Sequence, residues 1–149
     1  LYVEDVYLKQ FQELDPQDAE DIEKVIKGSG QTIRKRPYAD TWVKYLKSKG
    51  YHVYILSNYS SYMLDHTKKE LTFRREMDGE VFSCYANQLK PDAEIYQTIL
   101  NKYQLKPEEC VFVDDRPENC RGAQEQGIHT ICFKDFKQVT ADLEKLGVK

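Results

Sequence analysis

The chain has 149 residues, of which 40% are hydrophobic and 32% charged, and its formal net charge at pH 7 is −3. This length allows one domain with a buried core, and this composition is typical of a folded, soluble chain rather than a disordered one. The small negative charge gives no electrostatic reason to expect binding to nucleic acid or to an anionic membrane.

The lack of a visible membrane span or signal peptide, together with the cysteine pattern, favours a reducing compartment. No apolar stretch approaches the roughly 20 residues of a membrane span, and the first residues lack the basic region of a signal peptide. The cysteines form no CxxC pair, which argues against zinc and favours free thiols, some of them inside apolar runs. They are Cys84, Cys110, Cys120 and Cys132. We therefore expect a cytoplasmic protein, and because no initiator methionine is present we expect the sequence to begin inside a longer one.

Residues 1–36 are predicted to be helical. Residues 1–14 have a helical pattern, and a second helix is predicted to begin at Asp15-Pro16 and to end at Gly28-Ser29-Gly30. The residues predicted to face inward on the second helix are Ile22, Val25 and Ile26. Since no strand pattern occurs here, we interpret residues 1–36 as part of a small helical subdomain, joined to the rest by a glycine-containing linker.

Residues 37–149 alternate between helical and strand patterns. Strands alternating with helices indicate right-handed crossovers and a parallel sheet covered on both faces, which is an α/β fold. The predicted strands are 51–56, 81–85, 110–113 and 128–133. The predicted helices are 37–49, about 61–77, 92–103 and 117–127, with a last helix marked by Val139, Leu143 and Leu146.

The strand 110–113 runs directly into two acids, Asp114 and Asp115. Magnesium in proteins prefers a few hard oxygen ligands together with several waters, so Asp115 is the candidate metal ligand. Asp114 is the candidate to orient a ligand water or a lysine from behind it. Asn119 lies about one helical turn further on and is a possible third oxygen donor. The competing interpretation is a pair of acids that caps a helix.

Two other polar groups follow strands. Ser57 and Asn58 end the strand 51–56, where a hydroxyl and an amide or main-chain N–H can donate to phosphoryl oxygens. Lys90 precedes Pro91 and a predicted helix N-terminus, a setting that suits neutralisation of a phosphate. Each feature alone is as well explained by a turn or a solvated lysine. Their shared place after strands favours one ligand site, because open α/β sheets bind ligands there.

Taken together, these segments resemble the haloacid dehalogenase-like (HAD) superfamily, in the branch with a helical cap that includes sugar-phosphate phosphatases and the phosphatase domain of soluble epoxide hydrolase. The stretch 55–58 is similar to the second family motif, 89–92 with Ile95-Tyr96 to the third, and 111–115 through Asn119 to the fourth. The resemblance implies an HAD-like Rossmannoid sheet in residues 37–149 and a partial helical cap in residues 1–36. It implies that Ser57 and Lys90 bind phosphate, with Lys90 and Asp115 catalytic, and that Asp115 holds Mg²⁺.

The first motif of that family, a strand followed by Asp-x-Asp with a nucleophilic first aspartate, is absent from the chain. Asp5 has no acid two places later, and Asp15 and Asp18 are helix-start residues. In the family that strand is central, so we expect a gap between the strand ending at Ser57 and the strand ending at Val113. Three explanations are open: the segment lies upstream of Leu1, which we favour, another chain supplies it, or it does not exist.

The resemblance therefore predicts a phosphomonoester hydrolase that acts on a small phosphorylated metabolite through an aspartyl-phosphate in the full-length protein. Residues 1–149 alone are predicted to have little or no turnover. A dehalogenase of the same fold is disfavoured by the acid pair, because dehalogenation needs no metal. A phosphoacceptor receiver domain is disfavoured because its acid pair comes first in the chain. A catalytically silent HAD-like domain with a binding or structural role remains the alternative.

Overall fold

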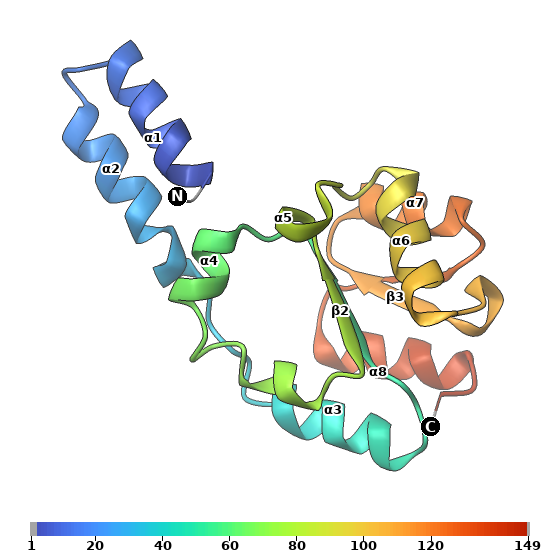
Figure 1. Cartoon of the computed structure of the whole chain (residues 1–149). Coiled ribbons are helices and arrows are strands. Elements are labelled where there is room, and N and C mark those ends of the chain that lie inside the picture. Colours follow the sequence, from blue (N-terminus) through green and yellow to red (C-terminus); the bar gives the residue numbers. More distant parts are fainter. Residues whose placement is uncertain (1–2, 149) are drawn as a thin grey trace.

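The computed structural model describes residues 3–148, which form a helical arm and an α/β core (Figure 1). The arm consists of two helices, α1 and α2, packed side by side, followed by a 3₁₀ turn. Their bounds are α1 Val3–Leu14, α2 Ala19–Gly28 and η1 Ser29–Thr32. Short helix α4 from the core (Ser61–His66) meets the base of the arm, where the Tyr62 hydroxyl donates to the Lys27 carbonyl oxygen at 3.2 Å.

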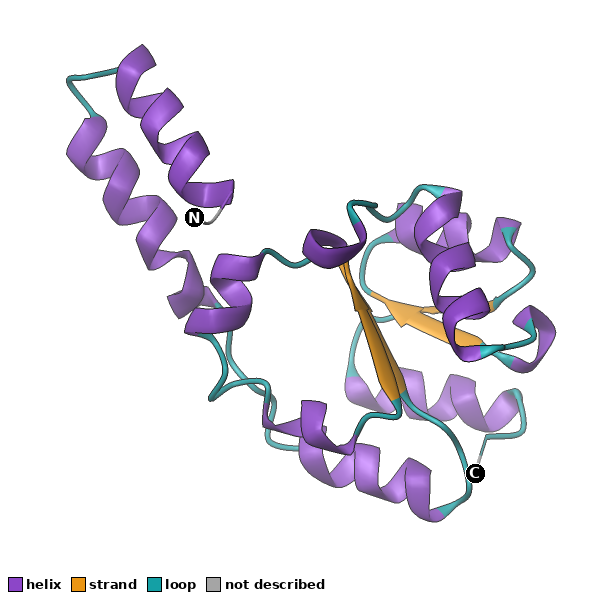
Figure 2. Cartoon of the chain, in the orientation of Figure 1, coloured by secondary structure: helices purple, strands orange, loops and turns teal. Residues whose placement is uncertain are grey.

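The core alternates strands and helices as the sequence predicts, which confirms the α/β class (Figure 2). The strands are β1 Tyr54–Ser57, β2 Gly79–Phe82, β3 Val111–Asp114 and β4 His129–Cys132. The helices are α3 Ala39–Ser48, α4, α5 Ser83–Ala86, α6 Ala93–Tyr103, α7 Pro117–Glu125 and α8 Phe136–Lys145, with 3₁₀ turns η2 Thr72–Glu76 and η3 Pro107–Glu109.

The four strands form two separate parallel pairs. β1 pairs with β2, with Tyr54 opposite Gly79, and β3 pairs with β4, with Val111 opposite His129. Among residues 3–148 no strand pairing joins β1 to β3. The two strands that the sequence analysis named are therefore unpaired with each other, and the absence of a family strand between them stays a prediction.

The hydrophobic core consists of two clusters, one on each face of the strands. One cluster packs under α6 and α7, around the buried residues Ile95, Tyr96 and Ala123, and includes Leu56 and Phe112 from the strands. A second cluster packs under α8 and α3; its members include Ile131, Val139, Leu143, Trp42, Val111 and Val113. Thus α6 and α7 cover one face of the strands, and α8 with α3 covers the other.

Three local predictions were wrong. The helix predicted for about 61–77 ends at His66, where the hydroxyl of buried Thr67 bonds back to the Met63 carbonyl oxygen at 2.6 Å, and a 3₁₀ turn follows later. The strand predicted for 81–85 ends at Phe82 and becomes α5. Val25, predicted to face inward, is 73% exposed, because an arm of two helices encloses little surface.

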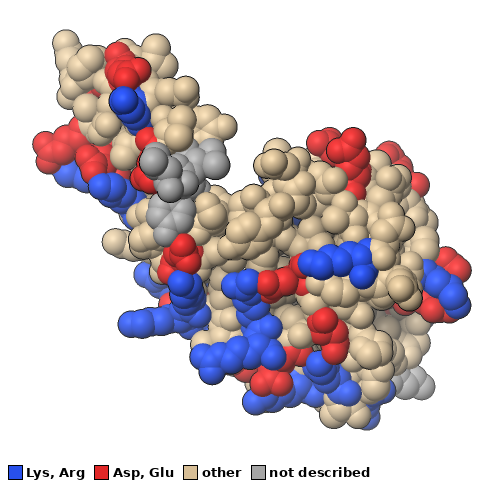
Figure 3. Space-filling view, in the orientation of Figure 1, with Lys and Arg blue, Asp and Glu red and all other residues tan. Residues whose placement is uncertain are grey.

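Acidic and basic side chains are mixed over the arm and the core on the face shown in Figure 3, as the small net charge predicts, and a hollow separates the arm from the core. Within the described part of the chain, no helix is long and apolar enough to cross a membrane.

Candidate functional site

Lys90 lies between the carboxyl ends of β1 and β3. Its side chain is only 7% exposed, and its Nζ donates to the carbonyl oxygen of Leu56 at 3.0 Å and to Oδ2 of Asp114 at 2.6 Å. Leu56 belongs to β1 and Asp114 to β3, so one ammonium group bridges the two halves of the core. The face of the Phe112 ring lies 5.3 Å from the same nitrogen and adds a cation–π contact.

Both carboxylate oxygens of Asp114 already accept hydrogen bonds from the protein, so Asp114 is not free to ligate a metal. Besides Lys90, its carboxylate accepts from the Arg116 N–H and from the Asn119 amide nitrogen, both at 2.9 Å on Oδ1. Burial opposes ionisation of this carboxyl, but these hydrogen bonds outweigh burial and hold its pKa below the usual value. These contacts place Asp114 beside the lysine, and its role behind a metal ligand stays a prediction.

Asn58 holds the backbone of Lys90. Its Oδ1 accepts from the Lys90 N–H at 2.8 Å and its Nδ2 donates to the Lys90 carbonyl oxygen at 2.9 Å. Because the side-chain amide is engaged in this way, the predicted phosphate contact of Asn58 is left to its main-chain N–H. The Lys90–Pro91 peptide bond is cis, and Asp92 takes the N-cap position of α6 without a capping hydrogen bond from its side chain.

Asp115 and Asn119 supply the remaining oxygen atoms near Asp114. Asp115 follows β3 directly and is exposed, so its carboxylate is open to a ligand. Asn119 is 2% exposed, and its Oδ1 has no hydrogen-bond partner within the described residues. A buried carbonyl oxygen without a donor is costly, so this atom fits a place beside a cation or its bound water.

The structure brings together most of the predicted site. Ser57 ends β1 one residue after Leu56, and Asp115 follows Asp114, so both lie next to the atoms that Lys90 bridges. Among the described residues, no three His, Cys, Asp or Glu side chains form a cluster able to hold a metal. A metal here would depend on Asp115, Asn119, water and substrate oxygens, the arrangement that magnesium tolerates.

Two residues that position the site, Tyr96 and Phe112, lie inside the family motifs, but the sequence analysis gave neither of them a role. Tyr96 is fully buried in α6, and its hydroxyl donates to the Asn119 carbonyl oxygen at 2.8 Å, which ties α6 to the start of α7. Burial raises the pKa of this phenol. The ring of Phe112 packs against Lys90. Both residues occur in helix or strand patterns that indicate core packing equally well, so their contacts with the site residues follow only from the three-dimensional structure.

Comparisons with known proteins identify the family of this chain. A model of the haloacid dehalogenase-like hydrolase family matches residues 3–127. The chain is 38% identical over 66 residues to flavin mononucleotide hydrolase 1 of Arabidopsis thaliana, which covers 44% of this chain and 27% of the relative. It is 30% identical over 107 residues to bifunctional epoxide hydrolase 2 of Rattus norvegicus, a match that covers 68% of this chain and 19% of the relative.

A solved structure of an HAD family enzyme from Bacteroides thetaiotaomicron, in complex with magnesium and inorganic phosphate, superposes with a TM-score of 0.63 at 26% identity. The match covers 70% of this chain and 57% of that chain. The chain therefore belongs to the haloacid dehalogenase-like hydrolases, as the resemblance predicted. It spans only 27% and 19% of the two curated relatives' lengths.

Proposed function

We propose that this chain carries the phosphate- and cation-binding part of a Mg²⁺-dependent phosphomonoester hydrolase that acts on a small phosphorylated metabolite. The observation that carries the proposal is the bridging position of Lys90 at the carboxyl ends of β1 and β3. An ammonium has three donors, and the described residues accept from two of them, Leu56 and Asp114. The third donor is therefore free for a phosphoryl oxygen, and Ser57 beside it supplies a hydroxyl.

The donor set also fits magnesium. Asp115 would ligate the ion, Oδ1 of Asn119 would ligate it or accept a hydrogen bond from its water, and Asp114 would hold Lys90 in place. When bound, Mg²⁺ offsets the negative charge that accumulates on phosphate during transfer. The described residues themselves bind and orient the phosphate. The carboxylate that would form an aspartyl-phosphate in the full-length protein is, in this proposal, outside residues 1–149.

Hydrolysis of p-nitrophenyl phosphate tests the proposal. We expect residues 1–149 alone to show little or no turnover, and a version extended at its N-terminus by a strand ending in Asp-x-Asp to be active with Mg²⁺ and inactive with EDTA. In the extended protein Lys90→Ala should lower kcat about 10²–10³-fold, the usual effect of removing one preorganised donor. Lys24→Ala, in an exposed surface ion pair, is the matched control and should change nothing.

An extended, folded protein that is silent, or whose turnover is the same with Asp115→Ala or without magnesium, would contradict the phosphatase proposal. Halide release from a 2-haloacid, measured on the same proteins, separates the dehalogenase alternative. Phosphate binding without turnover in the extended protein would instead support the catalytically silent domain.

A further inference from the structure

We propose that Cys120 of α7 and Cys132 of β4 are a redox-sensitive thiol pair, which a peroxide closes into a disulfide that weakens cation binding at Asp115 and Asn119. Formation of the disulfide is inferred from the positions of the two cysteines alone. Its effect on the cation rests on the proposed function, because the cation site is part of that proposal.

The two cysteines belong to different elements but point to the same side of the strands. Successive side chains of a strand point to opposite faces. Ile131 packs in the cluster under α8, so Cys132, the next residue of β4, points to the other face, where Ala123 of α7 packs. Cys120 is a buried residue of α7. The two side chains therefore meet between β4 and α7.

The Cys120 sulfur lies against the backbone that carries Cys132. Its Sγ is 3.5 Å from the carbonyl oxygen of Asp114 and 3.8 Å from that of Ile131, within reach of the weak hydrogen bonds of a thiol. Asp114 is the register partner of Cys132 in the β3–β4 pair, and Ile131 precedes Cys132 in the chain. Burial, and after it the neighbouring Cys132 thiol, raise the pKa of Cys120 to about 11, as expected for two thiols in contact.

The two thiols differ in exposure, which sets the order of the reaction. Cys132 is half-buried and Cys120 is 7% exposed, so a peroxide reaches the Cys132 sulfur first. That sulfur attacks a peroxide oxygen, the O–O bond breaks, and the products are a sulfenic acid on Cys132 and water or an alcohol.

The second step joins the two sulfurs. The Cys120 sulfur attacks the Cys132 sulfur, the S–O bond of the sulfenic acid breaks, and its hydroxyl leaves as water with the Cys120 proton. In sum, the two thiols lose two hydrogen atoms and two electrons, and the peroxide is reduced to water and an alcohol or to two waters.

The thiol pair lies directly behind the candidate cation site. The Cys132 Sγ is 3.9 Å from the carbonyl oxygen of Asp115, and Cys120 follows Asn119 in α7. Oxidation removes the S–H donors from the main-chain oxygens of Asp114 and Asp115 and fixes the first turn of α7 to the end of β4. Because magnesium demands near-ideal octahedral geometry, a shift of Asp115 against Asn119 weakens its binding.

Disulfide mapping of the unmodified chain tests the thiol pair. The chain is treated with hydrogen peroxide, its remaining thiols are alkylated, and it is digested with trypsin and a glutamate-specific protease, since cleavage after Glu118 separates Cys110 from Cys120. We expect a Cys120 peptide linked to a Cys132 peptide, in a monomeric chain, and loss of the link with dithiothreitol. Linkage through Cys84 or Cys110, linkage between chains, or oxidation of Cys132 to sulfinic acid alone would overturn the pair.

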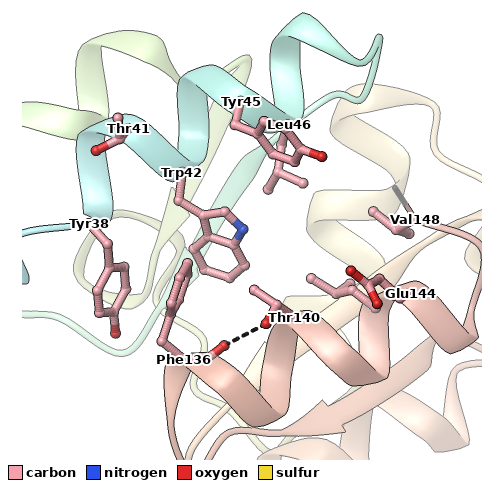
Figure 4. Close-up of a pocket in the computed structure, with 10 residues that line it drawn as sticks. Tyr38, Thr41, Trp42, Tyr45, Leu46, Phe136, Thr140, Glu144 and Val148 are labelled. Atoms are coloured by element: carbon pink, nitrogen blue, oxygen red, sulfur yellow. Dashed lines mark hydrogen bonds between the residues drawn. The ribbon is translucent and has the colours of Figure 1, made fainter.

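Trp42 reports whether the change stays local. It is the chain's one tryptophan and lies on the opposite face of the strands, where its ring meets Phe136 of α8 edge to face at 5.2 Å (Figure 4). Its fluorescence emission maximum should be the same in the reduced and oxidised chains. A red shift on oxidation would mean that the core opens as a whole, and would overturn the proposal of a disulfide that forms within the folded chain.

Mn²⁺ binding of the reduced and oxidised chains tests the effect on the cation. We expect oxidation to weaken Mn²⁺ binding, measured from broadening of the Asp115 and Asn119 amide signals, by about tenfold, a usual effect of disturbing the surroundings of a metal ligand. Reduction should restore it. After the same peroxide treatment Cys132→Ser should keep its affinity, and Cys84→Ser should lose affinity as the wild type does.

Equal Mn²⁺ affinity of the reduced chain and the chain with a mapped disulfide would overturn the redox control. If neither form binds Mn²⁺, the proposed cation site and its redox control both fail, and the mapped disulfide still supports the thiol pair.

Discussion

At the scale of single residues, the ion pair between Lys90 and Asp114 organises the site. Both side chains are less than 10% exposed, and each has further hydrogen bonds that fix its position. The sequence indicated both residues as site candidates from their place after strands. The sequence analysis named Asp114 as the acid that orients a ligand water or a lysine, but it could not choose between these two partners, because that choice depends on the tertiary packing around the end of the strand.

Removal of Lys90 should destabilise the chain strongly. Lys90→Ala leaves the Asp114 carboxylate buried without its cation, and breaking a buried pair in this way typically costs about 3–5 kcal/mol. Urea unfolding measures the loss. Lys24→Ala, whose partner Glu20 is 84% exposed, should cost less than about 1 kcal/mol. A loss of unfolding free energy below about 1 kcal/mol for Lys90→Ala would mean that the ion pair between Lys90 and Asp114 does not form in solution.

The same pair predicts a pH dependence. The folded-state pKa of Asp114 lies below the usual 3.8, so its ionisation stabilises the fold above that value, and the stabilisation is lost as pH falls through the lower folded-state pKa. The difference in unfolding free energy between the wild type and Asp114→Asn should therefore be constant near neutral pH and should shrink in acid. A difference that stays constant down to pH 2 would show that this carboxyl is not ionised in the native state.

At the scale of elements, α7 must lie very close to the loop that carries Lys90. A Cβ on Gly122 would overlap the Pro91 carbonyl oxygen and would meet Tyr96 at 3.1 Å. The absence of a side chain at this position lets α7 bring Asn119 against Asp114.

Gly122→Ala should therefore destabilise the chain by about 1–3 kcal/mol, the usual cost of overpacking. Gly28→Ala is the matched control: Gly28 has helical backbone angles and nothing within 4 Å of the added atom, so it should be neutral or stabilise by up to about 1 kcal/mol. Thermal unfolding compares the two variants. Equal unfolding temperatures for the two variants would indicate that α7 does not lie close to the loop that carries Lys90.

Most elements of the core could be predicted from the sequence, because their patterns are strong and local. Gly127 ends α7 with a φ of +80°, and Gly50 follows α3 with a φ of +87°, both where the sequence placed helix ends. The structure of segment 61–77 could not be predicted in this way. The helix ends at Thr67 because that residue is buried and its hydroxyl forms a hydrogen bond with the Tyr59 hydroxyl at 2.8 Å. A side-chain contact of this kind leaves no periodic signal in the sequence.

At the scale of the whole molecule, the arm and the core should differ in local stability. Helix α2 has no buried residue, and the arm exposes Val6, Tyr7, Phe11, Leu14 and Val25. The core, although divided, encloses several residues with no exposed surface. A segment with few buried contacts opens locally at a lower cost in free energy than a well-buried one.

Hydrogen exchange followed by mass spectrometry should therefore show the amides of α2 exchanging well before those of α6, which contains the fully buried Ile95 and Tyr96. Equal protection of the two helices would contradict the description of an arm that packs only lightly, and would indicate that its exposed apolar face is covered in solution.

The central claim is that Ser57, Lys90, Asp115 and Asn119 form one pocket for a cation and an anion. The most direct measurement is the amide NMR spectrum of residues 1–149 titrated with Mn²⁺ in the presence of phosphate. We predict that signals of residues 57–58, 90 and 115–119 broaden together, and that Asp115→Asn abolishes the broadening. Broadening elsewhere in the chain, or broadening that persists in Asp115→Asn, would contradict the account.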